Sequence, residues 1–298
     1  MTKKTLQVLL NIAKIALTFY ILWLIISQIN WKEMQASLSA LPYWVLALVV
    51  ALSALRHLGQ YFIWRWALQI NPLYELDRRE QLSSYLIGLP LRFVLPGGGA
   101  SLGKVLFVRN SSRWASVLAF VWEKGFLTWG TWSFGFLAVL LFYPDVHLWL
   151  RLAALAFCFT APLWTYFLIG LRHRSRPLQR GFLRYAPWMS VTQLLISLLT
   201  LVQYWLILDK LLPVGFWDSL VRMSLTQFSN SIPITFAGLG LRESFAIHFL
   251  KDLGYSASQA VSATLIVFLI QDVLPALIGL EPLNKARQER AGAANGRD

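Results

Sequence analysis

The sequence predicts an all-α, polytopic membrane protein with six full transmembrane helices and two oppositely oriented re-entrant hairpins, arranged as an inverted repeat. Three observations lead to this prediction. Hydrophobic residues make up 57% of the 298 residues and charged residues only 14%, against about 45–50% and about 25% in soluble domains. Apolar runs long enough to cross a bilayer recur along the chain. The net charge of +13 comes mostly from the polar breaks between those runs, which is how membrane orientation is encoded.

The same composition excludes several other classes of protein. A soluble fold of this size could not bury so much apolar surface, and the abundance of Leu, Ile, Val and Phe argues against disorder. The single cysteine, Cys158, excludes a disulfide scaffold. No motif for reading nucleic acid accompanies the positive charge. The mean hydropathy of +0.55 fits a chain that lies largely in lipid.

A helix needs about 20 mostly apolar residues to cross the hydrocarbon core. Six stretches meet that requirement, and no small-residue cleavage site follows the first, so we expect it to be a retained span. The predicted spans are Leu6–Ser27, Leu41–Leu68, Trp114–Phe142, Leu148–Gly170, Pro187–Leu208 and Ala257–Leu280.

Basic residues gather at one end of these spans, and 16 of the 27 lie in loops on that side. The positive-inside rule therefore places both termini in the cytoplasm. We expect the membrane to be the inner or plasma membrane of the cell. The residues counted are Lys3, Lys4, Arg78, Arg79, Lys104, Arg109, Arg113, Arg172, Arg174, Arg176, Arg180, Arg184, Lys285, Arg287, Arg290 and Arg297.

Two further apolar stretches, Gln81–Val108 and Leu220–Leu250, are interrupted by Pro and Gly. If either crossed the membrane, the basic loops would no longer share one side. We therefore predict that the first enters and leaves from the cytoplasm and the second from the outside. The halves then run from 1 to 143 and from 144 to 284, with a basic tail over 285–298. Secondary transporters built this way hold substrate where the broken segments meet.

The first broken stretch contains the glycine-rich segment Leu95–Lys104. Glycines allow positive φ and close backbone approach, so exposed amides could cradle an anion such as a lipid phosphate. A plain tight turn between two half-helices is the alternative. The candidate headgroup ligands here are Arg92, Gly97, Gly98, Gly103 and Lys104.

The second broken stretch contains the segment Asn230–Glu243. Gly238 and Gly240 precede Arg242 and Glu243 at the start of an apolar helix, where backbone amides attract anions and Arg can hold a phosphate bidentately. The alternative is an internal Arg242–Glu243 contact that only pins the hairpin. The candidate headgroup ligands here are Asn230, Gly238, Gly240 and Arg242.

Further charged and polar residues lie inside predicted spans, where isolated charges are costly. We expect them to face the interior and pair, as Lys124 with Asp272 or Glu123 with Arg242, and to gate transport or to act structurally. His57 we expect to be a satisfied buried histidine, and the scattered histidines predict no metal site and no cofactor. The candidate gating residues are Arg56, Gln60, Glu123, Lys124, Glu243 and Asp272.

The motif from Pro233 through Gly238-Leu239-Gly240-Leu241-Arg242-Glu243 resembles the P…GGlGxRE signature of the lysylphosphatidylglycerol synthase transmembrane-region, or flippase-like, family. Arg65-Trp66, Leu95-Pro96-Gly97 with Lys104, and Glu123-Lys124 also look like that family, and the resemblance covers roughly residues 6–281. Ala237 and Lys124 depart from the pattern, standing where Gly and Arg are usual. We expect no soluble aminoacyl-transferring domain. The resemblance implies translocation of a lipid or lipid-linked sugar, or support of envelope synthesis.

Together these observations favour a protein that binds and translocates an anionic phospholipid or a lipid-linked envelope intermediate, without being an enzyme. We expect its partners to be that lipid and the membrane, with no nucleic acid, and with an envelope-synthesis enzyme or a second copy as further candidates. A membrane-embedded transferase acting on a lipid headgroup is one alternative, because Glu123 or Glu243 could supply acid–base chemistry. A non-transporting accessory subunit of envelope lipid or polysaccharide synthesis is another.

Overall fold

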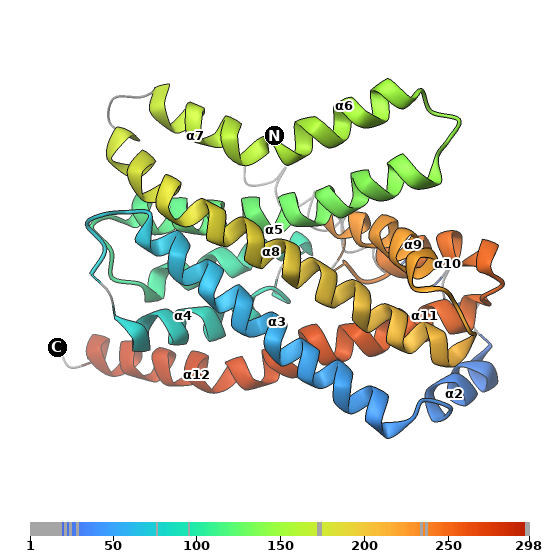
Figure 1. Cartoon of the computed structure of the whole chain (residues 1–298). Helices are drawn as coiled ribbons and strands as arrows, with labels where there is room; N and C mark the ends of the chain where they lie inside the picture. The colour runs from blue at the N-terminus through green and yellow to red at the C-terminus, as the bar shows by residue number, and fades with distance from the viewer. Residues whose placement is uncertain are drawn as a thin grey trace, which may run out of the picture.

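A computed structural model describes residues 20, 23, 26–27, 30–75, 77–94, 96–171, 175–232, 235 and 238–295. Those residues contain helices and connecting turns but no β-strand, which confirms the all-helical prediction (Figure 1). The predicted first span, Leu6–Ser27, lies outside the described residues apart from four positions. Other predicted features outside them are Lys3, Lys4, Leu95, Arg172, His173, Arg174, Pro233, Ala237 and Arg297.

Four helices are long and apolar enough to cross a membrane. They are α3 (Tyr43–Gln69), α5 (Arg113–Phe142), α8 (Arg176–Leu211), and the continuous rod formed by α11 (Ala257–Phe268), the π-helical turn η6 (Leu269–Val273) and α12 (Leu274–Asn295). Each of the four overlaps one predicted span, and α3 begins two residues after the predicted start at Leu41. The chain is thus a membrane protein, while the count of six spans stays a prediction.

The predicted span Leu148–Gly170 is two helices, α6 (Leu148–Phe159) and α7 (Ala161–Leu171), bent by 53°. Pro162 accounts for the bend because it has no N–H to donate to the carbonyl four residues earlier. That carbonyl, on Cys158, instead accepts a hydrogen bond from Trp129 Nε1 at 2.8 Å. The bent pair counts as one further membrane crossing only if both helices are taken together.

Each predicted broken stretch forms a pair of short helical segments that pack against one another. The first gives α4 (Arg78–Leu91) and η1 (Pro96–Phe107). The second gives α9 (Phe216–Phe228), which the single turn η3 (Ser229–Ser231) extends, and α10 (Leu241–Leu250). At about 1.5 Å per residue in an α-helix and about 2.0 Å in a 3₁₀ helix, none reaches across a core of about 30 Å. From Pro96 onward the glycine-rich segment forms the 3₁₀ helix η1, which is longer than the tight turn that was one of the two predicted alternatives.

Each short helical pair packs against a long helix from the other half of the sequence, an arrangement that we call the exchanged packing. Besides contacting each other, α4 packs on α12 and α9 packs on α5, so each short pair lies against the last long helix of the other half. The two central helices, α3 and α8, lie side by side and run in opposite directions (Figure 1). Outside this framework, α2 (Trp31–Ser39) packs against α11 and η5 (Lys251–Leu253) follows α10.

Two glycines make this exchanged packing possible. A Cβ built on Gly279 of α12 would overlap the Leu86 carbonyl oxygen of α4, and a Cβ on Gly135 of α5 would lie 2.6 Å from Phe228 Cδ2 of α9. Both helix pairs therefore approach more closely than any larger residue would allow.

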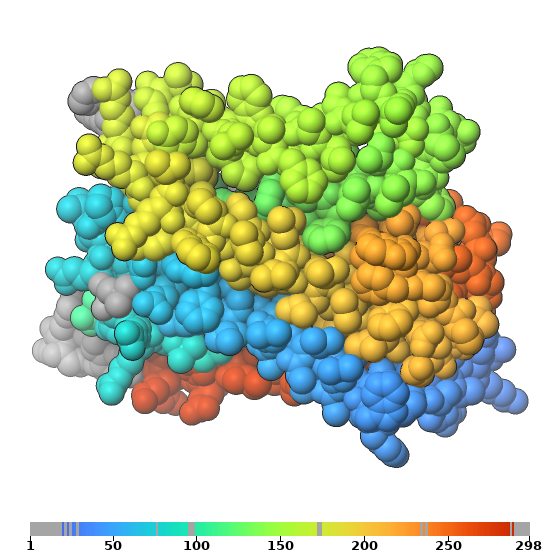
Figure 2. Space-filling view, viewed as in Figure 1, coloured from blue at the N-terminus to red at the C-terminus, as the bar shows by residue number. Residues whose placement is uncertain are grey.

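The molecule exposes many large apolar side chains, and its largely apolar interior also buries a set of polar ones. On α6 and α7, which form a layer along one edge of the molecule (Figure 2), Phe157 and Leu168 are 71% and 65% exposed. Large apolar side chains on α3, α5 and α8 also face outward, whereas Gln203, Arg242 and Asp272 are buried. An apolar outer surface together with buried charged groups is typical of a protein surrounded by lipid.

The exchanged packing predicts that Gly279→Ala and Gly135→Ala each destabilise the protein. The added methyl must displace Leu86 or Phe228, at a cost of about 1–3 kcal/mol, so thermal unfolding in detergent is expected at lower temperature. Gly125→Ala on α5 is the matched control, because no heavy atom lies within 4 Å of its added Cβ. Equal unfolding temperatures for all three variants would contradict the close packing.

Candidate functional site

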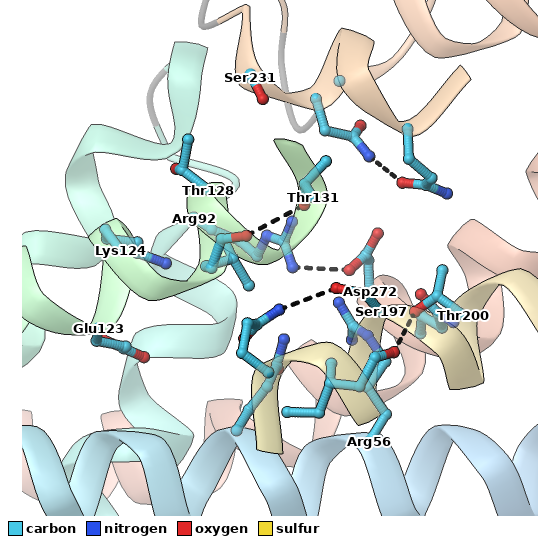
Figure 3. A pocket seen from close by; sticks show the side chains of 18 of the residues that line it. Arg56, Arg92, Glu123, Lys124, Thr128, Thr131, Ser197, Thr200, Ser231 and Asp272 are labelled. Carbon is cyan, nitrogen blue, oxygen red and sulfur yellow. Dashed lines mark hydrogen bonds and ion pairs between the residues drawn. The ribbon is translucent and has the colours of Figure 1, made fainter. Parts of the chain in front are cut away.

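A polar cavity of about 450 Å³ lies where the two short helical pairs meet the long helices (Figure 3). Residues of α3, α4, η1, α5, α8, α9, α10 and η6 line it. Asp272 is central in this view, with Arg56 below it and Glu123 and Lys124 on the opposite wall.

The long helices face this cavity with polar residues at helical spacing. On α5, Lys124, Thr128 and Thr131 stand at positions i, i+4 and i+7, and all three line the cavity. Such spacing keeps side chains on one face of a helix. The same pattern recurs on α3 and α8, so the apolar outer faces and the polar cavity belong to the same helices. The corresponding residues there are Arg56 and Gln60 on α3 and Gln193, Ser197 and Thr200 on α8.

The Asp272 carboxylate connects the two short helical pairs. Its Oδ1 lies 2.7 Å from Arg92 Nη1 at the C-terminal end of α4, and its Oδ2 lies 4.0 Å from Arg242 Nη1 on α10. Asp272 itself belongs to the π-helical turn η6. One buried carboxylate thus holds a cation from each half of the molecule.

The π-helical turn is held by hydrogen bonds from neighbouring helices. The Gln271 carbonyl oxygen accepts from His57 Nε2 at 2.9 Å, and the Ile270 carbonyl accepts from Ser53 Oγ at 3.3 Å. The Gln271 side chain also donates to Gln203 on α8. π-turns inside α-helices occur often at functional sites, and here the turn directs Asp272 into the cavity. His57, which also lies 2.8 Å from Tyr85 Oη, is the satisfied histidine that was predicted.

Arg242 and Glu243 form the internal contact that was the alternative interpretation of this motif. Arg242 Nη2 lies 2.7 Å from Glu243 Oε1, and Glu243 Oε2 accepts a hydrogen bond from the Gly240 backbone amide at 2.6 Å. Gly238 and Gly240 have φ values of 80° and 86°, which favour glycine. The Gly240 amide is therefore already bonded rather than exposed to an anion, while the Arg242 side chain still lines the cavity.

Lys104 is enclosed on several sides. Its Nζ lies 2.5 Å from Glu123 Oε2 and 3.7 Å from the centre of the Trp64 ring, and its side chain is only 4% exposed. Its stem passes over Gly88 of α4, where an added Cβ would lie 2.8 Å from Lys104 Cδ. Ion pairing and a cation–π contact together stabilise this buried ammonium group.

Arg56 and Lys124 have no carboxylate within ion-pair distance in the part of the chain that the structure describes. Two buried nitrogens of Arg56, Nε and Nη1, make no hydrogen bond there, and the ammonium of Lys124 lies 5.4 Å from the Phe120 ring centre. Five basic side chains and two carboxylates, Glu123 and Asp272, line the cavity. With Glu243, which pairs with Arg242 from behind, the described site carries two positive charges in excess.

A protein-family model described as the lysylphosphatidylglycerol synthase TM region matches residues 11–279 of this sequence. The chain belongs to that family. No curated protein matches the sequence. The match confirms the resemblance drawn from the motif around Arg242, and it agrees with the apolar helices in assigning the chain to the membrane.

Ten of the residues that the sequence predicted for the site line this cavity. They are Arg56, Gln60, Arg92, Lys104, Glu123, Lys124, Asn230, Gly238, Arg242 and Asp272. Glu243 and Gly240 stand behind Arg242, and Gly103 packs instead against Leu91. The backbone of Gly97 and Gly98 belongs to η1.

The predicted pairing of these charges was wrong. Glu123 pairs with Lys104 rather than Arg242, and Asp272 pairs with Arg92 rather than Lys124. The reason is that α4 and η1 bring their own cations to the carboxylates of α5 and η6. Gly97 and Gly98 of the predicted phosphate cradle lie in the first turn of the 3₁₀ helix η1, and their role as headgroup ligands stays a prediction.

Sequence reasoning missed the uncharged polar residues of the cavity, chiefly Thr128, Thr131, Ser197 and Thr200. A signal for them existed. In α5 the threonines continue the face of Lys124, and in α8 Ser197 and Thr200 continue the face of Gln193, each at a spacing of three or four residues. A polar stripe in an apolar span indicates an interior face.

The buried Lys104–Glu123 pair predicts a double-mutant result. Lys104→Met or Glu123→Gln alone is expected to cost about 3–5 kcal/mol, because each leaves one buried partner uncompensated. The double variant is expected to unfold at a higher temperature than either single variant. Asp209→Asn, which breaks the more exposed Lys210–Asp209 contact at 2.7 Å, is the control and is expected to change stability little. Additive losses at positions 104 and 123 would contradict the pairing.

Proposed function

We propose that this protein binds an anionic phospholipid, or a lipid-linked envelope intermediate, and moves its headgroup through the cavity from one leaflet to the other. The observation that carries this proposal is the pair of cavity cations, Arg56 and Lys124, that face no carboxylate among the described residues. Family membership supports a role in lipid synthesis or flipping.

Charge bookkeeping favours an anionic ligand. A cation inside the membrane is costly without a partner, and a phosphate supplies the missing negative charge together with several hydrogen-bond acceptors. Arg56 offers unpaired N–H groups to such a phosphate, and the hydroxyls of Thr128 and Thr131 continue the polar wall toward the second short pair. The headgroup would therefore remain solvated by protein along this path.

Arg92, Lys104 and Arg242 remain candidate headgroup ligands, but with a different role from that of Arg56. Each is already neutralised by a carboxylate, so a phosphate reaches them only by replacing that carboxylate. Replacement of Asp272 would release α4 from α10 at the centre of the molecule. In this proposal the lipid phosphate itself loosens the link between the short pairs, and Asp272, Glu123 and Glu243 gate the path.

The exchanged packing supports an inverted repeat. Each half contributes a long helix, a short packed pair and a further long helix or rod, and each short pair lies on the other half's last helix. We propose that α4–η1 enters from the cytoplasm and α9–α10 from the outside of the inner or plasma membrane, with both termini cytoplasmic. Non-helical backbone at depth is tolerated when it is buried or lines a cavity, as in transporters with broken helices.

This topology predicts which pairs of positions share a side of the membrane. In a background with Cys158→Ala, single cysteines at Arg79 and Arg109 are expected to react with a membrane-impermeant thiol reagent only from the cytoplasmic side. Cysteines at Trp217 and Lys251 are expected to react only from the outside. Opposite-side labelling within either pair would mean that the short segments cross the membrane, and the re-entrant arrangement would be abandoned.

The translocation proposal predicts a selective loss of transport in Arg56→Gln/Lys124→Gln. Purified protein in vesicles is expected to move a fluorescent phosphatidylglycerol, and the double variant is expected to slow that movement at least about tenfold, because each lost charge-assisted hydrogen bond is worth about 1.5–3 kcal/mol. The measurement is the rate at which an impermeant quencher gains access to the label.

The control for that experiment is Lys32→Gln/Lys251→Gln, which removes two exposed cations outside the cavity and is expected to leave the rate unchanged. A normal rate in the Arg56/Lys124 double variant would remove the proposed site. Equally fast movement of a phosphatidylcholine probe by the native protein would refute recognition of an anion. Chemical conversion of the labelled lipid would instead favour the membrane-embedded transferase.

A further inference from the structure

A second exposed surface follows one face of α8, on the side away from the cavity. Starting at the N-terminal end, three arginines are followed by three apolar residues, all exposed and all spaced by three or four positions. Side chains at such spacing form one stripe along a helix. We call these residues the α8 stripe: Arg176, Arg180, Arg184, Trp188, Val191 and Leu195.

Beside the arginines lies a groove of about 1050 Å³ between the C-terminal end of α3 and the start of α8. The two helices meet closely at its base, because a Cβ on Gly181 would overlap the Ile70 carbonyl oxygen. Gln69, Asn71 and Tyr185 add polar atoms to the walls. The groove is therefore a formed concavity rather than a set of charges on a convex surface.

The groove is strongly electropositive. Arg176, Arg180 and Arg184 all line it, and no acidic side chain does so among the described residues. None of the three arginines takes part in an ion pair within that part of the chain. Three guanidinium groups on successive turns offer many N–H donors in forks that match phosphate geometry. The groove thus has the chemistry of a phosphate site.

The apolar part of the stripe indicates what carries that phosphate. Trp188 is 62% exposed, and Val191 and Leu195 are 54% and 56% exposed, directly below Arg184 along the same helix. Tryptophan at this position is typical of the membrane interface, and aliphatic side chains beyond it face hydrocarbon. α8 lies at the surface of the molecule in Figure 2. A charged head followed by apolar surface matches a phospholipid better than a free anion or an acidic protein.

We propose that the groove and the α8 stripe bind an anionic phospholipid of the cytoplasmic leaflet as a resident ligand. Its phosphate lies on Arg180 and Arg184 with Arg176 beside them, and an acyl chain follows Trp188 toward Leu195. This site differs from the translocation cavity, which the opposite face of α8 lines through Gln193 and Ser197. A lipid bound there braces α8 against α3, the two central helices of the fold.

The test is native mass spectrometry of the full-length protein in nanodiscs that contain phosphatidylglycerol and phosphatidylcholine. The native protein is expected to retain phosphatidylglycerol selectively. Arg176→Gln/Arg180→Gln/Arg184→Gln is expected to weaken that retention by about fivefold for each arginine removed. Trp188→Ala is expected to weaken it while keeping the charge, which only a ligand with an apolar part explains.

The charge-matched control is Arg78→Gln/Arg79→Gln/Arg113→Gln, which removes three cations from the same end of the molecule outside both cavities. Equal loss of lipid in the control would refute a specific site, as would full retention in the α8 variant. Displacement by inorganic phosphate alone would identify a free-anion site and refute the lipid, and co-purification of a protein on the groove would do the same.

Two further measurements keep the result interpretable. Arg176→Lys/Arg180→Lys/Arg184→Lys retains the charge and is expected to restore part of the binding. A misfolded α8 variant would be revealed by its elution profile and helical content. Arg56→Gln/Lys124→Gln is expected to keep this resident lipid. The two proposals can therefore fail separately: loss of transport leaves the α8 site intact, and loss of the resident lipid leaves the charges of the cavity unchanged.

Discussion

The Asp272 carboxylate joins parts of the chain that are far apart in sequence. It contacts Arg92, which is 180 positions earlier, and it lies 4.0 Å from Arg242 on α10. Isolated charges are costly inside a membrane, so the buried Asp272 carboxylate depends on the cations around it, whereas Arg242 also has Glu243 as a partner at 2.7 Å. Both short helical pairs pack around the cavity, and each brings one cation to within 4.0 Å of this carboxylate.

The π-helical turn explains how one residue serves both halves. A π-helical turn has more residues per turn than an α-helix, so it changes the direction of the side chains that follow its start. If Leu269–Val273 were regular α-helix, Asp272 would point in a different direction. Carbonyl groups in this turn are hydrogen-bonded by Ser53 and His57 of α3. The direction of the central carboxylate is thus fixed by a helix from the other half, which parallels the exchange of α4 and α9 between the halves.

Much of this architecture follows from the sequence, because burial in lipid demands long apolar runs whose lengths are set by bilayer thickness. The runs that became α3, α5, α8 and α11–α12 were identified on that basis, as were the Pro- and Gly-rich interruptions. Seven of the ten candidate residues that line the cavity are charged, and charged groups at membrane depth are expected to share a protein interior. The motif around Arg242 also sufficed to identify the family.

Other features could not be predicted because they depend on tertiary geometry. Which cation meets which carboxylate depends on how far α4 and η1 penetrate, and nothing local to Glu123 specifies Lys104 as its partner. The break near Pro162 was missed because a proline in an apolar run is often tolerated, and here the freed Cys158 carbonyl finds Trp129. The helical winding of the glycine-rich segment likewise depends on its packing against α4 and α5.

The enclosure of Lys104 has an evolutionary consequence. The ammonium group needs the Trp64 ring and the Glu123 carboxylate, and its stem occupies the space that the missing side chain of Gly88 leaves open. A change at any one of these positions alters what the others tolerate. Substitutions there are therefore expected to be inherited together, and correlated variation among related sequences at positions 64, 88, 104 and 123 would record this enclosure.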